Sequence, residues 1–501
     1  MAILSTPSTG IVKAFRMDNC VAVPMADIPL CHEDDFRRCV MQCHEDGARL
    51  VALFMPEPSE LMAVLSADES GELAVVRAKI GNSFSSLTAE LPSAQAFERE
   101  IQEAHGVRPE GHPWPKPLRR HADLEEPASP ESAHSFFAVQ GSGIHEVAVG
   151  PVHAGVIEPG HFRFQCAGET VLHLEIQLGY QHRGVEAALR NAAPGSRISV
   201  AESIAGDTSI GHGLAHTGAM EALAGVEPPL RAQALIGIAL ELERLSNHVG
   251  DLGALCNDVA FLPGAAWLGR IRGDFLNSLL DLSGNRLGRG FLCPGGIRFD
   301  PDDTCRKSIL KKLNAADKDL QHVLDVVFRA PTVVSRFEQT GKLSRALADT
   351  LGLVGPAARA CGCDRDVRRD HPSGIFRFAQ IPVTVNDAGD VMARAFTRAV
   401  ETRRSMRFLR EQLELLPPGP IAVTMPALLP DHFVVSLTEG WRGEIVHMAM
   451  TDSRGALVFY KVVDPSFHNW LGLAMAMRGQ LISDFPLCNK SFNLSYAGHD
   501  L

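Results

Sequence analysis

The pattern of hydrophobic and polar residues predicts a short first part that mixes strands and helices. Residues 47–55 and 72–80 are nearly continuous apolar runs of strand length, which is typical of buried strands. Residues 36–46 and 94–105 instead place apolar side chains at helical spacing. We therefore expect a small α+β domain at the start of the chain.

Longer helical patterns dominate the second part. The clearest helix is expected over residues 229–251, where apolar residues recur every three or four positions and form one stripe. Pro228 and Pro229 suit its first turn, where backbone amides need no partner inside the helix. The other expected helices are residues 265–282, 306–328 and 390–416, and the expected strands are 147–156, 161–176, 421–425, 432–437 and 444–463.

A low-complexity segment separates the two parts. Residues 121–135 are rich in Ala, Pro, Ser and Glu and lack apolar periodicity, as a linker does. The domains we predict are residues 1–122 and 144–501, joined by a linker over residues 123–143. The fold class is α+β: a small α+β domain followed by a mainly helical domain with peripheral β-strands.

Composition narrows the classes of partner. A net charge of −11 without a cluster of Lys and Arg argues against nucleic acid. The chain lacks a run of about 20 apolar residues and a secretory signal, so we expect a cytosolic or peripherally attached protein. Its 11 cysteines do not suggest a disulfide framework. For the close pairs Cys39–Cys43 and Cys361–Cys363 we favour buried thiols over a metal site.

Residues 96–121 read AFEREIQEAHGVRPEGHPWPKPLRRH. The elements Glu98-Arg99-Glu100, Gly111-His112-Pro113 and Arg119-Arg120 occur in this order. The segment resembles the closing signature of the 30-kDa-type (C-type) subunits of complex I. The resemblance implies that the first part is a complex I 30-kDa-type domain.

The second part carries motifs spread over most of its length. They are GPVHAG (150–155), EPG (158–160), LGYQHRG (178–184), ELERLSNH (241–248), PGG (294–296), GPAARA (355–360), RRDHP (368–372) and TEGWRG (438–443). In this order they resemble the D-type subunits of complex I and the large subunits of group-4 [NiFe] hydrogenases. A fusion of both families in one chain resembles the large subunits of formate hydrogenlyase and hydrogenase-4.

The nickel ligands of the hydrogenase family are missing. Nickel in that family is held by four thiolates, from two Cys-x-x-Cys pairs, because it prefers soft sulfur ligands. Alignment on His212 places Ala205 and Thr208 at the first pair. Near the second pair only Cys488 is a cysteine, and Lys490 and Asn493 align nearest to the ligand positions. We therefore expect no nickel-dependent hydrogen chemistry.

The quinone-binding pair of the D-type family is also incomplete. Gly206 aligns nearest to its tyrosine, and its second histidine falls in the altered residues 155–159. The resemblance leaves His153, Glu202, Asp207 and His212 as candidate catalytic residues of an acceptor cavity. These groups, with Lys490 as a further candidate, suit proton relay or a hydrogen bond to a redox headgroup. We expect the chain to bind no metal or cofactor by itself.

Two polar clusters have alternative explanations. His212 and His216 lie one helical turn apart, as in a zinc site, but the glutamate of an HExxH motif is absent. We favour packing or helix capping for at least one of them. Glu243, Arg244 and His248 could form a buried relay or a solvated ion pair. The resemblance favours a third role for them, in docking an iron–sulfur subunit.

The resemblance implies a peripheral-arm large subunit of a membrane-bound oxidoreductase, on the cytoplasmic face of the plasma membrane. Its expected partners are an iron–sulfur small subunit of the complex I B type, a membrane subunit of the complex I H type and antiporter-like membrane subunits. A quinone-like or other proton-coupled acceptor would be reduced in the cavity, with ion translocation coupled to it. The chain has no GxGxxG motif, so any link to NAD(H) would belong to the assembled complex.

Two alternatives stay open. The chain could be a structural scaffold that transmits conformational change without redox chemistry. It could also be a nickel hydrogenase that recruits other ligands.

Overall fold

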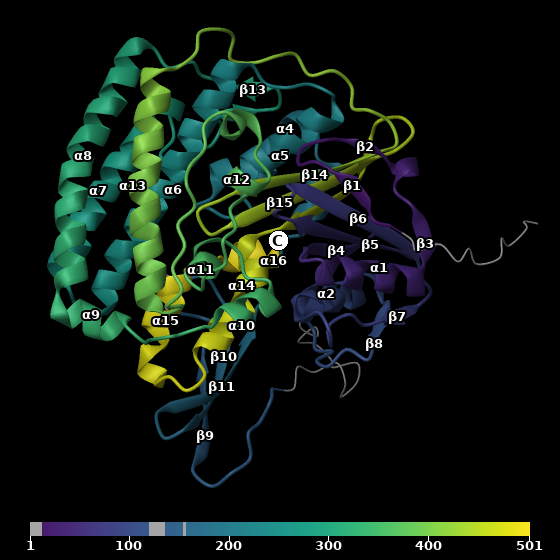
Figure 1. Cartoon of the computed structure of the whole chain (residues 1–501), viewed down its shortest axis with the longest axis horizontal. Coiled ribbons are helices and arrows are strands. Elements are labelled where there is room, and N and C mark those ends of the chain that lie inside the picture. The colour runs from purple at the N-terminus through teal and green to yellow at the C-terminus, as the bar shows by residue number, and fades with distance from the viewer. Residues whose placement is uncertain (1–12, 120–135, 154–156) are drawn as a thin grey trace, which may run out of the picture. The chain divides into compact units, whose positions relative to one another are not determined.

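The computed structural model describes residues 13–119, 136–153 and 157–501 (Figure 1). The chain divides into two compact units. The first unit comprises Met1–Asp18 and Val23–Pro117, and the second comprises Asn19–Ala22 and Leu118–Leu501. Residues 123–135 of the predicted linker lie outside the described residues, so the predicted domain limits stay predictions.

The first unit is an α+β fold with a five-stranded sheet. The strands are β1 (Phe15–Met17), β3 (Leu30–His32), β4 (Arg49–Glu57), β5 (Glu60–Ala67) and β6 (Glu72–Lys79). They run in the order β1-β6-β5-β4, and β3 pairs with β6 further along the edge that β1 occupies. The interiors of β4, β5 and β6 are buried on both faces, which explains their continuous apolar runs. The predicted strands and both predicted helices are confirmed.

The remaining elements of the first unit are β2 (Val23–Pro24), η1 (Met25–Asp27), α1 (Glu33–Glu45), β7 (Ser83–Ser85), η2 (Pro92–Ala94), α2 (Gln95–His105) and β8 (Arg108–Glu110).

Four long helices lie side by side in the second unit (Figure 1). They are α6 (Leu230–Asp258), α7 (Leu262–Ser283), α8 (Asp303–Arg329) and α13 (Val391–Glu414). All four were predicted and are confirmed. The single apolar stripe predicted for α6 was too narrow, because α6 is surrounded by α5, α7, α13 and α15. It therefore buries polar residues such as Glu241 and Arg244 as well as its leucines.

Two antiparallel groups of strands flank these helices. β9 (Ile144–Val149), β10 (His161–Ala167) and β11 (Thr170–Gln177) pair in the order β11-β10-β9. β14 (His432–Glu439), β15 (Glu444–Thr451) and β16 (Leu457–Val463) pair in the order β16-β15-β14. The predicted strand over residues 421–425 is wrong, since Ala422 makes only an isolated bridge with Gly296. Prolines at 417, 418, 420 and 426 remove the amides that a strand needs.

Shorter helices connect these parts. α5 packs against β14 and β15, which brings its residues next to the strands that carry His447 and Tyr460. Among the described residues, no helix combines the length and hydropathy required to cross a membrane. The remaining elements of the second unit are α3 (Val185–Asn191), α4 (Pro194–Ala201), α5 (Ser209–Leu223), β12 (Leu292–Cys293), β13 (Gly296–Ile297), α9 (Pro331–Phe337), α10 (Arg345–Leu351), α11 (Gly355–Arg359), α12 (Val367–Asp370), η3 (Gly374–Arg377), α14 (Pro465–Ala476), η4 (Ile482–Asp484), α15 (Phe485–Phe492) and α16 (Tyr496–Asp500).

Candidate functional site

The loop between α4 and α5 holds two of the predicted site residues, Glu202 and Asp207. Glu202 is buried, and its two carboxylate oxygens accept the backbone N–H of Gly290 at 3.0 and 3.1 Å. Burial raises the pKa of Glu202, and the Gly290 amide and two nearby arginines oppose that rise only in part. Glu202 can therefore hold a proton more readily than an exposed glutamate.

Glu243 of α6 fixes the start of α5. Its carboxylate accepts the N–H of Ile210 at 2.7 Å and of Gly211 at 3.0 Å, two of the amides that the first turn of a helix leaves without partners. Burial raises the pKa of Glu243 to about 8, although both amides act in the opposite direction. The buried carboxyl thus ties the loop to the central helix.

Asp207 forms a two-pronged ion pair with Arg442. Nη1 and Nη2 of Arg442 lie 2.6 and 2.8 Å from the two carboxylate oxygens of Asp207. The Arg442 side chain is 6% exposed, whereas the Asp207 side chain is 37% exposed. Burial by itself would raise the pKa of Asp207, but the charge and hydrogen bonds of Arg442 outweigh it and lower that pKa. The loop therefore presents an ionised carboxylate to its surroundings.

Two arginines fasten the C-terminal residues to this loop. Nε of Arg442 donates to the carbonyl of Asn493 at 2.5 Å. Nη2 of Arg183 donates to the carbonyl of Ile204 at 2.8 Å and to that of Ala497 at 3.1 Å. Segments almost 300 residues apart in sequence are thereby brought together. Lys490 lies one turn before this segment, and its amine donates to Asn493 Oδ1 at 3.3 Å.

The residues around this loop do not fit a thiolate-bound nickel site. Ala205 and Thr208 offer no thiol. Cys488 is fully buried, and its thiol lies against Gly341 and near Arg394. Burial raises the pKa of Cys488 to about 12, so it disfavours the thiolate that a soft metal requires. Among the described residues, no group of three His, Cys, Asp or Glu side chains is placed to hold a metal ion.

The two histidines of α5 have separate partners. Nε2 of His212 is 3.0 Å from Asp464 Oδ2, and its Nδ1 is 3.1 Å from His447 Nε2. His216 instead lies 2.8 Å from the hydroxyl of Tyr460. Both rings are fully buried. His212 thus lies behind the loop in the interior, where it belongs to a polar cluster that the sequence did not reveal.

His153 does not join the other predicted residues. Its Nε2 lies 2.9 Å from the carbonyl of Gly160, and its ring packs near Phe162. Among the described residues, no hydrogen bond or ion pair connects His153 to Glu202, Asp207 or His212. The neighbouring residues 154–156 lie outside the described part of the chain, so the altered 155–159 segment is only partly defined.

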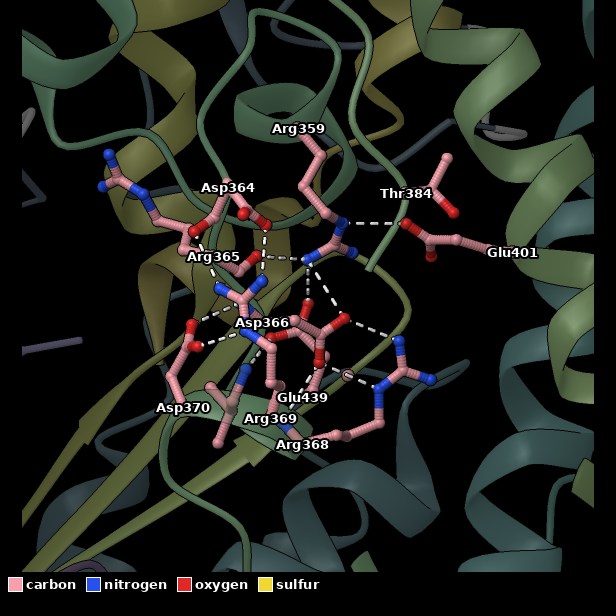
Figure 2. A network of polar contacts seen from close by, with 12 residues as sticks. Arg359, Asp364, Arg365, Asp366, Arg368, Arg369, Asp370, Thr384, Glu401 and Glu439 are labelled. Atoms are coloured by element: carbon pink, nitrogen blue, oxygen red, sulfur yellow. Dashed lines mark hydrogen bonds and ion pairs between the residues drawn. The ribbon is translucent and has the colours of Figure 1, made fainter. Parts of the chain in front are cut away.

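A buried ionic network lies on the other side of the β14–β15 turn (Figure 2). At its centre Arg359 binds Glu401 at 2.8 Å and Glu439 at 2.7 Å. Arg368 binds Asp366 at 2.6 Å and Glu241 at 2.8 Å. Its members are Glu241, Arg244 and His248 of α6, Arg359 of α11, Asp366 and Arg368 at α12, Glu401 of α13 and Glu439 of β14.

Arg244 and His248 belong entirely to this interior network. Both side chains are fully buried, and both bind Glu401, at 2.6 and 3.0 Å. A solvated ion pair and a role in docking a partner are therefore wrong for these two residues, because neither reaches the surface. Arg244 and His248 form a buried network with Glu401, whereas Glu243 binds the first turn of α5 and does not join them, so the predicted relay of all three residues is not formed.

The network contains more carboxyl groups than guanidinium groups. Glu241, Asp366, Glu401 and Glu439 face Arg244, Arg359 and Arg368, which is four against three. Burial and the charge of Asp366 raise the pKa of Glu439 to about 7, against the lowering effect of the arginines. Glu439 therefore releases its proton at a higher pH than an exposed glutamate does.

The site and the network share the turn from Glu439 to Arg442. Nη1 of Arg244 donates to the carbonyl of Gly440 at 2.5 Å, while Arg442 reaches Asp207 on the other side. Gly355 also touches the turn: a Cβ there would lie 2.2 Å from the Arg442 carbonyl, and its φ is +67°. Only glycine can adopt this positive φ and also leave room for the Arg442 carbonyl.

The motifs had pointed to several members of the network without giving their roles. Arg359, Arg368 and Glu439 lie in the GPAARA, RRDHP and TEGWRG motifs. Glu401 lies on an expected helix, but no local pattern separates it from a surface glutamate. His447 and Tyr460 were likewise missed, because alternation in a strand predicts burial and not partners.

Two family models match the chain. The model described as "Respiratory-chain NADH dehydrogenase, 30 Kd subunit" matches residues 31–132. The model described as "Respiratory-chain NADH dehydrogenase, 49 Kd subunit" matches residues 258–500. The two matches fall in the order expected from the motifs.

Several characterised proteins are similar over most of their length. Formate hydrogenlyase subunit 5 of Escherichia coli is 29% identical, over 83% of this chain and 77% of its own. Membrane-bound hydrogenase subunit alpha of Pyrococcus furiosus is 30% identical, over 70% of this chain and 85% of its own. Carbon monoxide-induced hydrogenase of Rhodospirillum rubrum is 29% identical, over 70% of this chain and 97% of its own.

A solved structure has the same fold. It is a chain of the membrane-bound sulfane sulfur reductase, described as an archaeal respiratory membrane complex. The TM-score is 0.68 at 22% identity, and the match covers 72% of this chain and 99% of that chain.

Proposed function

Because the chain belongs to the family of complex I 49-kDa-type subunits and membrane-bound hydrogenase large subunits, we propose that it lines an acceptor cavity. The chain is an oxidoreductase subunit of a membrane-bound, hydrogenase-like or complex-I-like respiratory complex. On this proposal an iron–sulfur small subunit passes electrons to a quinone-like or other proton-coupled acceptor. The chain acts only in the assembled complex, peripherally at the cytoplasmic face.

The observation that carries the proposal is the Asp207–Arg442 pair. Two-electron reduction of a quinone-like headgroup consumes protons, so its site needs charged or hydrogen-bonding groups that the acceptor can reach. The Asp207 side chain is 37% exposed, and the buried Arg442 side chain fixes its orientation. Gly206 beside it is exposed and carries no side chain, and a Cβ there would meet nothing closer than 4.0 Å. The loop therefore leaves space next to an oriented carboxylate.

The other candidate residues take supporting roles in this proposal. Glu202, with a raised pKa, and the buried His212 supply groups that hold or pass protons. His153 and Lys490 are proposed to lie along the wall of the cavity. Membrane partners of the complex I H type and of the antiporter-like type would couple the reaction to ion translocation.

The test uses the intact complex purified from its natural host. Asp207→Asn should lower the rate of quinone reduction at least tenfold, because the neutral amide no longer provides the ionised carboxylate, while subunit composition stays unchanged. Asp68→Asn is the matched control, since Asp68 forms a similar half-buried, two-pronged pair with Arg49 in the first unit. Metal analysis and the iron–sulfur spectrum are measured on the same samples.

Three results would contradict the proposal. Unchanged turnover of Asp207→Asn would favour the structural scaffold. One nickel atom per complex would instead indicate a hydrogenase that recruits other ligands. An equal loss in Asp68→Asn would show that the effect comes from stability and not from the site.

A further inference from the structure

A chain of hydrogen bonds crosses the interior of the second unit, from Asp464 to His216. Asp464 caps α14, His212 and His216 lie on α5, His447 lies on β15 and Tyr460 lies on β16. The four contacts are, in order, Asp464 Oδ2 to His212 Nε2 at 3.0 Å, His212 Nδ1 to His447 Nε2 at 3.1 Å, His447 Nδ1 to the Tyr460 hydroxyl at 2.8 Å, and the Tyr460 hydroxyl to His216 Nδ1 at 2.8 Å. The chain links four separate elements without a gap.

All five side chains are withdrawn from water. Their residues are 0 to 3% exposed, and no ring reaches the surface. Burial lowers the pKa of His216 to about 3 and lowers that of His447 as well, so both rings are neutral. Burial would raise the pKa of Asp464, but its hydrogen bonds to His212 and Ser466 and the charge of Arg442 lower it on balance. Asp464 is therefore the carboxylate end of the chain.

The protonation of Asp464 determines the direction of every hydrogen bond. A neutral imidazole has one N–H donor and one acceptor nitrogen. With one N–H on His212, that ring donates through Nε2 to the Asp464 carboxylate, which only accepts, and it accepts through Nδ1. By the same reasoning His447 donates through Nε2 and accepts from the Tyr460 hydroxyl, which accepts from Nδ1 of His216. Nε2 of His216 is then left with a lone pair.

The far end of the chain has no partner. Nε2 of His216 is buried and lacks a hydrogen-bond partner among the described residues. Leaving a buried nitrogen without a partner costs about 1–3 kcal/mol. Arg197 of α4 is the cation whose charge acts on both His216 and Tyr460. The charge of Arg197 therefore disfavours a proton that stays on His216.

The near end lies close to the loop between α4 and α5 (residues 202–208, called the acceptor loop below), since the charge of Asp464 acts on Asp207. Asp464 contacts the C-terminal segment that Arg442 and Arg183 fasten to the loop. A Cβ at Gly498 would come within 2.5 Å of Asp464 Oδ2, and Ser466, two residues after Asp464, accepts the amide of Ser495 at 2.9 Å. One hydrogen-bonded path therefore runs from Nε2 of His216 to Asp464, next to the acceptor loop.

We propose that this chain is a proton relay that supplies the acceptor site, a role that rests on the proposed function. When a proton is supplied at Nε2 of His216, the Nδ1 proton of that ring moves to the Tyr460 oxygen. The Tyr460 proton moves to Nδ1 of His447, and the Nε2 proton of His447 moves to Nδ1 of His212. The Nε2 proton of His212 then moves to Asp464. Each ring gains one proton and loses one, so the net change is a protonated Asp464 beside the acceptor loop.

The test interrupts the chain at two points in the assembled complex. Tyr460→Phe keeps the ring but removes the hydroxyl in the middle, and His216→Gln removes the nitrogen at the receiving end. Each is expected to lower quinone reduction at least tenfold and to increase the solvent isotope effect in D2O, because proton delivery becomes limiting. The double variant is expected to lose no more than either single variant, since both interrupt one path.

Ser278→Ala is the matched control, because it removes a different fully buried hydroxyl, which donates to the carbonyl of Asp274 within α7. Unchanged turnover in both variants, or losses that multiply in the double variant, would overturn the relay. If Tyr460→Phe fails to assemble, His216→Gln decides alone through its rate and isotope effect. Loss of turnover in Asp207→Asn with normal turnover in the relay variants would leave the proposed function intact and reject only the relay.

Discussion

Two clusters of arginine and carboxyl groups share the turn between β14 and β15, and they differ in exposure and in charge balance. The first cluster consists of one carboxyl group, that of Asp207, and one guanidinium group, that of Arg442. The Asp207 side chain is 37% exposed. The network around Arg359 holds four carboxyl groups and three guanidinium groups, all buried. The first cluster keeps its carboxylate ionised, whereas burial and the excess charge raise the pKa of Glu439 to about 7 in the second.

This difference shows that an arginine partner alone does not determine the state of a carboxyl group. Desolvation penalises the charged form in both clusters, and the number of compensating cations decides which effect is larger. The balanced pair suits a fixed charge at an acceptor. The unbalanced network suits a group that takes up and releases a proton. The following predictions test this contrast.

Arg359→Met should produce the largest loss of stability. The substitution leaves Glu401 and Glu439 buried without their shared cation, which costs about 3–5 kcal/mol in comparable buried pairs. Chemical unfolding of the second unit, followed by tryptophan fluorescence, measures this loss. Arg270→Met is the control, because Arg270 is half exposed in its ion pair with Asp274. The control should change stability by less than about 1 kcal/mol. Equal losses would contradict the contrast.

Glu439→Gln should change how stability depends on pH. The pKa of Glu439 is about 7 in the folded chain, against about 4.3 in an unfolded one. The folded chain binds the extra proton between these values, so this group's contribution to stability declines as the pH rises from about 4.3 to 7. The variant lacks this decline. Unfolding midpoints measured from pH 4.5 to 8 should therefore diverge from those of the parent protein, and parallel curves would reject the assignment.

Asp207→Asn should have the smallest effect on stability. The pKa of Asp207 is lowered in the folded chain, so its contribution is present above about pH 3.9, the unfolded value, and is lost as the pH falls through the folded value. Because the side chain is more than one-third exposed, water screens the pair and the loss at neutral pH should stay below about 1 kcal/mol. A loss as large as that of Arg359→Met would show that both clusters are structural.

Local patterns predicted most elements because they reflect one face or one run of buried side chains. The helices around residues 229–251 and 390–416 and the strands over 47–55 and 72–80 are examples. The prediction over 421–425 failed because apolar residues between prolines cannot supply a ladder of amides. Glu202, Asp207 and His212 were proposed from the family resemblance, which could not predict how exposed each side chain is. His153 was grouped with them, although the structure shows no direct contact.

The sequence by itself determined that residues 205 and 208 supply no thiolate, since alanine and threonine carry no sulfur in any fold. It also determined the order of the motifs and hence the family. Only the tertiary structure decided which polar groups share an environment. Arg368 meets Glu241 across 127 residues, and His212 meets Asp464 across 252. The physical reason is that a buried charge or imidazole acquires its partners, and therefore its proton, from elements packed against it and not from its neighbours in sequence.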